Sequence, residues 1–516
     1  MIYETDRRGI VIMEIIEIKN KSIEGGGEAL DLYEARSIRA EISSNAKEYK
    51  SEATVVVQTY NQLEQVKRCV SSILEYTKDV DYDLLLIDNG SESKEILDFF
   101  KEIEHPKKTI LHIENNIGAG FPNEVISLNR VSDFVAFVPC DLILTSNWLS
   151  NLLKVMKSDK KIGMVNPVCS NVTSYQCVEI EYDSYEEMQD KAALYNVSDP
   201  TKWQECIKLV TLGIVIRKEC IYAIGWPVND AGFWHDFMDD DMAFRIRRAG
   251  YKVVIARDTW ICHDHPMDSR DPVKNRISFD SGRRNFIQKY RDIDACIDAG
   301  NFVSDILNKH IKAVNTENPK ILGIDVKCGA PILDIKNMIR RFGIFDAELS
   351  AYTRQEKYTV DLKTICEGSV ICDREEYLTR KLLFNEYDYI VIGDAINGYY
   401  EPINVLMDAY MLLKQGGQLF FSLKNTNNIY ALLQMLGYTV TLQDEYYYNY
   451  PMNSIFRDIK KMGINISYVA MEQLANVERD ILETGCKIMN EYCVISDKNE
   501  MFTRLTADKI WFCIEK

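Results

Sequence analysis

Carboxylates and histidines stand at a few places in this sequence where they could bind a cation or move a proton. In "DFVAFVPCDLIL", an apolar run suited to a strand buried on both faces ends at Cys140, and a carboxylate follows at Asp141. Further along, "DTWICHDHPMD" supplies His263 and His265, two of only 6 histidines. In an extended segment this i, i+2 spacing points both rings to one side, which suits joint ligation of a metal or one ligand beside one phosphate donor. For a single histidine, a surface or core position is the simpler alternative.

A second group of carboxylates lies in "GFWHDFMDDDMAFRIRRAGYKV". Three successive aspartates, 239 to 241, begin a predicted helix, and their mutual repulsion is expected to raise the pKa of one of them, although a helix N-terminus offsets part of it. The alternative is a solvated acidic helix start. Against it stand neighbouring aromatic residues that suit stacking on a sugar or an acceptor, namely Phe233, Trp234 and Phe237.

The elements that must position these residues follow a regular alternation. Apolar, β-branched runs predict strands at 54–58, 83–88, 109–114 and 134–138, and amphipathic patterns predict helices at 62–76, 92–104 and 119–130. This alternation predicts a doubly wound, mostly parallel α/β sheet, in which ligands collect beyond the carboxyl ends of the strands. Each polar residue at those ends could also serve an ordinary turn or helix cap. These residues are Thr59, Tyr60, Asn61, Asp88, Asn116, Gly118 and Asp141.

Taken together and in order, these residues resemble family 2 of the inverting GT-A glycosyltransferases, over roughly residues 53–290. The resemblance implies that Asp88 of "LLLIDNGS" accepts a hydrogen bond from uracil, and that "VVVQTYN" and "NNIGAGFPN" frame the nucleoside and its diphosphate. The strand "TLGIVIRKECIYAIGWP" and the tail "FDSGRRNFIQKYRD" also match the family. The donor-binding set that the resemblance implies is Thr59, Tyr60, Asn61, Asp88, Asn116, Gly118, Asn123, Cys140, Asp141, Gly213, Arg283 and Arg284.

The resemblance also implies a metal site. Asp141 takes the place of the last aspartate of the DxD motif, with "PCD" standing where DxD is usual, so that fewer protein charges face the cation. His263, with His265 as second choice, takes the place of a downstream histidine ligand. A Mg²⁺ or Mn²⁺ ion bridging diphosphate oxygens stabilises the charge that develops as the diphosphate leaves.

The catalytic base is implied by the same alignment. The spacing from Asp241 to "RRAGY" places the base of the family on Asp239, and a shift of one residue would place it on Asp240. Such a base takes the proton of an acceptor hydroxyl as its oxygen attacks the anomeric carbon opposite the leaving diphosphate.

A second α/β unit begins at "PKILGIDVKCGAPI" and, over residues 319–425, resembles the Rossmann-like methyltransferases that use S-adenosylmethionine. Asp325 and Gly329 match the family's cofactor turn, but Lys327 and Ala330 stand where relatives usually have glycine. The acidic residue expected after the second strand is missing unless Glu348 serves. We therefore do not expect S-adenosylmethionine to bind.

The chain is expected to comprise an N-terminal appendage, a GT-A domain, a helical linker and a methyltransferase-like domain with a C-terminal extension, at residues 1–50, 51–290, 291–318 and 319–516. The net charge of −17 argues against a protein that coats nucleic acid or anionic membrane. No signal peptide or transmembrane segment is evident, so a cytoplasmic protein is expected. The 14 cysteines have no metal-type spacing and are expected to be mostly buried apolar residues.

These features predict an inverting glycosyltransferase that moves a sugar, N-acetylglucosamine, from a UDP-sugar to an acceptor hydroxyl. The acceptor expected is Ser or Thr of a protein such as flagellin. Three alternatives stay open: transfer to a surface polysaccharide, an S-adenosylmethionine-dependent methyltransferase with an accessory sugar-binding domain, and a non-catalytic scaffold. The oligomeric state does not follow from the sequence.

Overall fold

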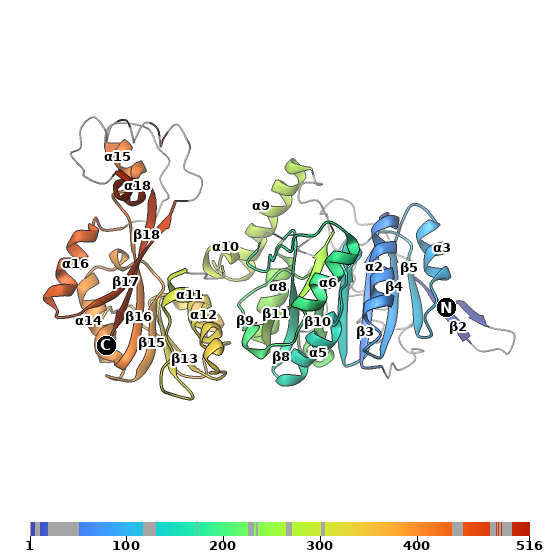
Figure 1. The fold of residues 1–516 in the computed structure, drawn as a ribbon, viewed down its shortest axis with the longest axis horizontal. Helices are drawn as coiled ribbons and strands as arrows, with labels where there is room; N and C mark the ends of the chain where they lie inside the picture. Colours follow the sequence, from blue (N-terminus) through green and yellow to red (C-terminus); the bar gives the residue numbers. More distant parts are fainter. Residues whose placement is uncertain are drawn as a thin grey trace. The chain divides into compact units, whose positions relative to one another are not determined.

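The computed structural model divides the chain into two compact units, Met1–Asn301 and Phe302–Lys516, which are described separately (Figure 1). The division falls within the predicted linker 291–318, so that α10 (Ala295–Asp298) belongs to the first unit and α11 (Asp305–His310) to the second. The structure describes residues 2–5, 11–18, 51–116, 131–172, 174–224, 232–233, 236–264, 271–300, 305–435, 447–474, 481, 483, 487 and 498–516.

The first unit is built on one mixed sheet. Its strand order is β1-β2-β5-β4-β3-β6-β10-β8-β11-β7, with β9 beside β11. The run β2-β5-β4-β3-β6 is parallel, whereas β10 is antiparallel to both of its neighbours. The predicted α/β fold with a mostly parallel sheet is confirmed. The strands are β1 (Ile2–Thr5), β2 (Val11–Ile18), β3 (Ala53–Thr59), β4 (Tyr82–Asn89), β5 (Lys108–Ile113), β6 (Phe134–Pro139), β7 (Leu142–Ile143), β8 (Ile162–Cys169), β9 (Trp203–Glu205), β10 (Ile214–Arg217) and β11 (Lys252–His263).

The helices of this unit alternate with the strands as predicted, apart from the helix expected at 119–130, which lies outside the described residues. Because β2, which lies within the predicted N-terminal appendage, pairs in parallel with β5, the appendage contributes to the first sheet. The helices are α2 (Leu63–Tyr76), α3 (Glu95–Glu102), α5 (Trp148–Ser158), α6 (Tyr185–Tyr195), α7 (Lys218–Ile224), α8 (Met238–Arg248), α9 (Pro272–Lys289) and α10.

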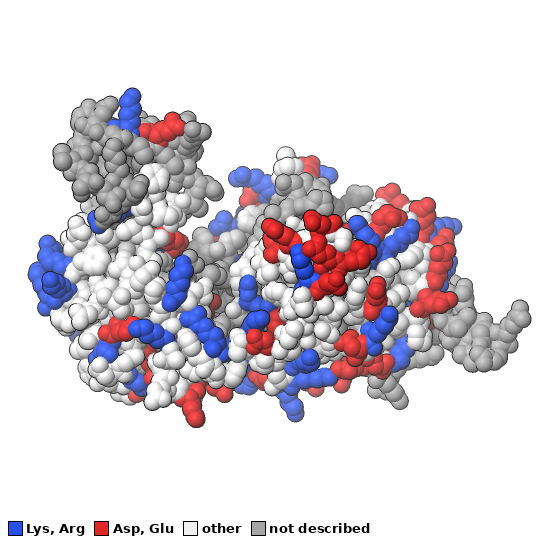
Figure 2. Space-filling view, viewed as in Figure 1, with Lys and Arg blue, Asp and Glu red and all other residues white. Residues whose placement is uncertain are grey.

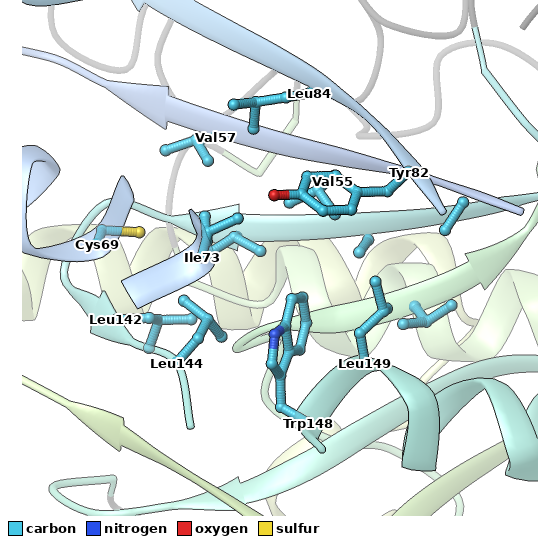
Figure 3. Close-up of a cluster of buried hydrophobic side chains, with 14 of the residues drawn as sticks. Val55, Val57, Cys69, Ile73, Tyr82, Leu84, Leu142, Leu144, Trp148 and Leu149 are labelled. Atoms are coloured by element: carbon cyan, nitrogen blue, oxygen red, sulfur yellow. The ribbon is translucent and has the colours of Figure 1, made fainter. Parts of the chain in front are cut away.

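Helices cover both faces of this sheet, which explains why its central strands are apolar without interruption. Every residue of β4 is buried. On one face, Ile73 of α2 and Trp148 of α5 pack against Val55 of β3 (Figure 3). The next residue of β3, Val56, joins the cluster on the other face. Two cores therefore hold the strands in one register, and that register decides which strand ends meet.

The second unit has its own sheet, ordered β14-β13-β12-β15-β16-β18-β17. The strands from β14 to β16 are parallel, and β18 is antiparallel to both neighbours. This is the Rossmann-like unit that was predicted. Its strands are β12 (Lys320–Ile324), β13 (Glu348–Thr353), β14 (Val370–Cys372), β15 (Tyr387–Ile392), β16 (Leu413–Lys424), β17 (Ile466–Gln473) and β18 (Ala507–Glu515), and its helices are α11, α12 (Ala330–Ile339), α13 (Thr359–Leu362), α14 (Pro402–Leu412), α15 (Ile429–Met435), α16 (Met452–Lys461) and α18 (Lys498–Thr506).

The surface of the first unit carries acidic side chains over α6, a helix that contains Glu186, Glu187 and Asp190 (Figure 2). Such a surface repels polyanions, in keeping with the net charge. Among the helices that the structure describes, none combines the length and the apolar character needed to span a bilayer.

Candidate active site

The carboxyl ends of three parallel strands meet at one edge of the first sheet. Thr59, the last residue of β3, pairs with Asp88 near the end of β4, and on its other side β3 pairs Gln58 with Pro139 at the end of β6. Adjacent strands lie about 4.8 Å apart. The residues that follow these strands are therefore neighbours, although they come from distant parts of the sequence.

The loops after β3 and β4 are tied together by hydrogen bonds. The backbone N–H of Asn61 donates to Ser91 Oγ at 3.1 Å, and the N–H of Glu92 donates to Asn61 Oδ1 at 2.8 Å. Asn61 has a φ of 55°, a left-handed conformation that asparagine tolerates. The Tyr60 hydroxyl donates to Glu92 Oε1 at 3.4 Å, and the Tyr60 side chain is exposed. Tyr60 and Asn61 are thus held at the rim of the edge.

Asn116, which follows β5, lies against the loop after β4. Asn89 Nδ2 donates to Asn116 Oδ1 at 3.0 Å. A Cβ atom on Gly90, whose φ is +74°, would lie 2.5 Å from the carbonyl carbon of Asn115 and from the nitrogen of Asn116. Only glycine permits this close approach. The predicted site residues Gly118 and Asn123 lie outside the described residues.

Asp88 has two hydrogen-bond partners within the protein. Its side chain is buried, Oδ1 accepts the N–H of Ser91 at 3.1 Å, and Oδ2 lies 2.9 Å from Nδ1 of His112. Each oxygen has one partner inside the protein, and the predicted contact with uracil stays a prediction. Asp88 braces the loop after β4 through Ser91. The hydrogen bond to Asp88 raises the pKa of His112, which favours an imidazolium–carboxylate pair.

Sequence analysis missed His112. It pairs with Asp88 directly across the ladder between β4 and β5. Its place one residue before the end of an apolar strand was a signal, but the partner became evident only from the register of the two strands.

The structure brings Asp141 and His263 together. Pro139 has no N–H with which to continue a ladder, and after it the chain turns so that Leu142 of β7 pairs with His263 at the end of β11. The Asp141 carbonyl accepts the N–H of Asp264 at 2.9 Å. Asp141 Oδ2 lies 3.5 Å from His263 Nε2.

A divalent cation fits this pair. Asp141 Oδ1 is buried and has no hydrogen-bond partner among the described residues. Nδ1 of His263 lies 3.0 Å from the carbonyl oxygen of Asn171, which can only accept, so in the neutral ring Nδ1 carries the hydrogen and the lone pair of Nε2 faces Asp141. The described residues contain no cluster of three or more His, Cys, Asp or Glu side chains with metal-site geometry. A cation here would take two protein ligands and complete its shell from substrate and water. His265 lies outside the described residues.

Protons compete with a cation for this pair. Burial lowers the pKa of His263, but the Asp141 carboxylate and the Asn171 carbonyl raise it by more, so its pKa lies above the usual value. Burial raises the pKa of the neighbouring Cys140 thiol to about 12, and this thiol donates to Gln62 Oε1 at 2.8 Å. It closes the turn that carries Asp141.

Gly213 lies close to Ile261 of β11 and to Leu142, the residue after Asp141. Its φ is +65°, and an added Cβ would lie 2.7 Å from Ile261 Cδ1 and 3.5 Å from Leu142 Cδ1. The glycine is therefore required by packing within the protein. Two residues earlier, Thr211 donates its hydroxyl to Oδ1 of Asp239. The short segment Thr211–Gly213 thus connects the Asp141 turn with the acidic start of α8.

The three successive aspartates have three different partners. Asp239 accepts from Thr211, and no Lys, Arg or His of the described chain forms an ion pair with it. Asp240 pairs with Lys208 at 2.9 Å. Asp241 is buried and is held by partners from α8 and α9: Arg245 Nε at 3.0 Å, Lys289 Nζ at 2.5 Å and the Tyr290 hydroxyl at 2.7 Å. Asp241 is therefore a structural anchor, and Asp239 is the carboxylate without a cation.

Burial raises the pKa of Asp239 to about 6, and the nearby charges of Asp240 and Asp236 raise it as well, while the Thr211 hydroxyl lowers it. The residue is only partly exposed to solvent. A carboxylate with a pKa near 6 can accept a proton at neutral pH and still be mostly ionised beforehand, which suits a general base.

The interpretation of the neighbouring aromatics as sugar-stacking residues is wrong for Phe233 and Phe237. Both are buried, and their rings lie 6.3 Å and 6.0 Å from that of Phe286 on α9. They join α8 to α9 in a small core. Trp234 lies outside the described residues.

The two arginines predicted for the diphosphate differ in their surroundings. Arg283 donates from Nε at 2.9 Å and from an Nη nitrogen at 2.5 Å to Oδ2 of Asp294, and this pair raises its pKa. Two nitrogens of the Arg283 guanidinium are therefore already bound to a carboxylate of the protein. Arg284 lies next to it on α9 and is exposed.

In the second unit, an ion-pair network fills the edge at which a Rossmann-like fold would receive its cofactor. Arg354, which follows β13, donates from Nε to Asp325 Oδ2 at 2.7 Å and reaches Glu376 at 3.1 Å and Asp394 at 3.4 Å. The Tyr399 hydroxyl donates to the same Asp325 oxygen at 2.7 Å, and the guanidinium lies 4.0 Å from the Tyr399 ring centroid. Asp325 therefore has protein partners where a cofactor would need access.

Glu348 cannot replace the missing ribose-binding residue, so this interpretation is wrong. It is the first residue of β13, at the opposite edge of the sheet from the carboxyl ends, and the residue just beyond the end of that strand is Arg354. Lys327 has a φ of 53° and fills a turn position for which glycine is preferred. The observed residues do not fit S-adenosylmethionine.

One segment of the chain that contributes to this site matches a known protein family. Residues 54–203 match the family model of glycosyl transferase family 2. The family 2 segment contains Thr59, Asp88 and Asp141, and it ends before Asp239 and His263. This match supports the prediction of a transferase enzyme. No curated protein matches the sequence.

Three solved structures are similar to this chain. They are GalNAc-T7 with UDP, GalNAc and Mn²⁺ (14% identity, 42% of this chain and 44% of that one, TM-score 0.34); the mannosyltransferase PcManGT from Pyrobaculum calidifontis with GDP-Man and Mn²⁺ (16%, 50% and 71%, 0.35); and a SAM dependent methyltransferase from Archaeoglobus fulgidus (14%, 45% and 98%, 0.28). The chain spans less than half of the first of these chains.

Proposed function

We propose that this chain is an inverting glycosyltransferase that moves N-acetylglucosamine from a UDP-sugar to an acceptor hydroxyl. The observation that carries the proposal is the pairing of Asp141 with His263 at the strand-end edge, with Oδ1 of Asp141 left unpartnered among the described residues. The family 2 match over the strands that form this edge supports it.

On the donor side, Asp141 and Nε2 of His263 would hold Mn²⁺ or Mg²⁺, and His265 is a further candidate ligand. When bound, such a cation stabilises the negative charge that develops on the departing diphosphate. The proposed donor site lies along the rim formed by the exposed ring of Tyr60 and the tied loop of Asn61. Asp88 supports this rim from beneath through Ser91.

On the acceptor side, Asp239 acts as the base. It takes the proton of the acceptor hydroxyl while that oxygen attacks the anomeric carbon from the face opposite the diphosphate. Asp239 is favoured over Asp240, because a carboxylate paired with Lys208 is a weaker proton acceptor than one without a cation.

The acceptor we propose is a Ser or Thr hydroxyl of a protein such as flagellin. The support for a protein acceptor is the presence of a second folded unit, Phe302–Lys516, in the same chain, which offers further surface for a macromolecular acceptor. Transfer to a surface polysaccharide is the competing outcome, and acceptor panels of proteins and glycans separate the two.

The rival function, a methyltransferase with an accessory sugar-binding domain, is disfavoured by the network around Arg354. Calorimetry of the full chain with S-adenosylmethionine tests it. Binding in the micromolar range would favour the methyltransferase, whereas no heat is expected.

A panel of nucleotide sugars with Mn²⁺ tests the proposed function, with release of nucleoside diphosphate as the readout. The variant Asp141→Asn is expected to lose activity. Asp133→Asn is its matched control, because Asp133 is an exposed carboxylate just before the opposite end of the same strand, β6. A folded protein that releases no nucleoside diphosphate from any donor would show that the proposal is wrong.

A further inference from the structure

The segment that carries Thr211 is held firmly by buried amides. The N–H of Val210 donates to Gln176 Oε1 at 2.7 Å, and Gln176 Nε2 donates back to the Val210 carbonyl at 3.1 Å. The N–H of Leu212 donates to Asn166 Oδ1 at 3.2 Å. Both amide side chains are fully buried. The Thr211 hydroxyl is therefore presented from a fixed piece of backbone.

This hydroxyl meets the proposed base. It donates to Oδ1 of Asp239, and the backbone N–H of Thr211 also favours the ionised carboxylate. A carboxylate held through one oxygen in this way keeps its plane, and its second oxygen keeps a fixed direction.

We propose that Thr211 is the positioning residue of the base: its hydroxyl holds Oδ1 of Asp239 and leaves Oδ2 to accept the proton of the acceptor. The inference rests on the proposed function and deepens it. Thr211 touches neither the donor nor the transferred proton in this arrangement, so it acts through Asp239 alone.

The charges around Asp239 explain why such a partner is needed. Burial and the two nearest carboxylates all disfavour its ionised form. Three described cations of the region, Lys208, Arg245 and Lys289, pair with the other two aspartates. The charged groups packed around Asp239 are Asp236 before α8, Asp240 with its partner Lys208, and Asp241 with its partners Arg245 and Lys289. Thr211 therefore supplies a stabilisation of the carboxylate that no cation among the described residues supplies.

Removing the hydroxyl should shift the protonation of the base. In Thr211→Val, which keeps the shape of the side chain, the carboxylate loses a donor and holds its proton to higher pH. The acidic limb of the kcat/KM profile is expected to move to higher pH. A rise of about one pKa unit, which corresponds to one hydrogen bond to a charged group, lowers the ionised fraction at pH 6 from about one half to about one eleventh, so the rate at pH 6 should fall about fivefold. Near pH 9 the loss should be smaller.

The assay follows hydrolysis of UDP-N-acetylglucosamine with Mn²⁺, in which water is the acceptor. The water oxygen bonds to the anomeric carbon, the bond to the diphosphate oxygen breaks, and Asp239 takes the proton. Thr211→Ser keeps the hydroxyl, so the acidic limb of its kcat/KM profile should lie at the same pH as in the wild type. The inference would be overturned if this limb did not move in Thr211→Val, or if it moved equally far in Thr211→Ser.

A second measurement needs no activity. The unfolding free energies of Thr211→Val and of Thr211→Val with Asp239→Asn are compared between pH 4 and pH 9, and the same comparison is made between the wild type and Asp239→Asn. In each pair the difference grows from the pKa of Asp239 in the unfolded chain and levels off at its pKa in the native state. The difference should level off at higher pH in the Thr211→Val pair than in the wild-type pair. If the wild-type chain hydrolyses no nucleotide sugar, the proposed function fails while this comparison still decides whether Thr211 controls the carboxylate. Levelling off at the same pH in both pairs would overturn the inference.

Discussion

Replacing the Asp239 carboxylate by an amide should abolish sugar transfer and at the same time stabilise the first unit at neutral and alkaline pH. The magnitude follows from the raised pKa. Burial moves it from 3.8 to about 6. At about 1.36 kcal/mol per pKa unit, a displacement of roughly 2 units corresponds to about 3 kcal/mol, which is an upper value because some of the carboxylate's charge is screened by solvent.

The sign of the pH dependence is fixed by proton binding. Between pH 3.8 and about 6 the native state binds more protons at Asp239 than the unfolded state, so the native state loses stability as the pH rises through this window. Above that window the ionised Asp239 carboxylate lowers the unfolding free energy by its full amount. The variant Asp239→Asn has no carboxylate at this position, so its unfolding free energy is not lowered. The two proteins should therefore be almost equally stable near pH 4, and the variant should be more stable by about 2 to 3 kcal/mol at pH 8.

Urea unfolding followed by tryptophan emission measures this difference, because every tryptophan except Trp511 belongs to the first unit. Asp240→Asn is the matched control. It removes the partner of Lys208 and should destabilise the unit at pH 8 by about 1 kcal/mol, the opposite sign. The reasoning would be refuted if Asp239→Asn were no more stable than the wild type at pH 8, or if its advantage did not shrink at pH 4.

Three further variants test other parts of the structure. Gly90→Ala forces a Cβ into the backbone after β5 and should lower the unfolding free energy of the first unit by about 2 kcal/mol or more in urea unfolding; Gly250→Ala, with φ +90° but nothing within 4 Å, should cost only about 1 kcal/mol. His263→Gln should weaken Mn²⁺ binding at least about tenfold in calorimetry, and wild-type affinity in this variant would exclude the imidazole as a ligand. Arg354→Met leaves the buried Asp325 carboxylate without its cation and should lower the stability of the second unit by about 3 kcal/mol in scanning calorimetry, without creating S-adenosylmethionine binding; an unchanged transition would show that the network contributes nothing.

Local patterns in the sequence determined much of the architecture. Apolar runs that end in polar residues marked the strand ends, and their alternation with amphipathic segments predicted both α/β units. A residue such as Asp141 was found because a charge directly after a buried strand must lie at the edge of the sheet. These features depend on a few neighbouring residues and on the period of side chains along the chain, so the sequence alone carries them.

Tertiary structure decided which of the candidate residues have partners. Three adjacent aspartates are equivalent in the sequence, but among the described residues packing pairs Asp240 with Lys208, Asp241 with groups of α8 and of the end of α9, and Asp239 with Thr211. His112 became the partner of Asp88 through the register of β4 and β5, which no local pattern encodes. Burial and charge pairing depend on contacts between segments far apart in the chain, and these contacts determine whether a carboxylate is an anchor, an ion-pair partner or a base.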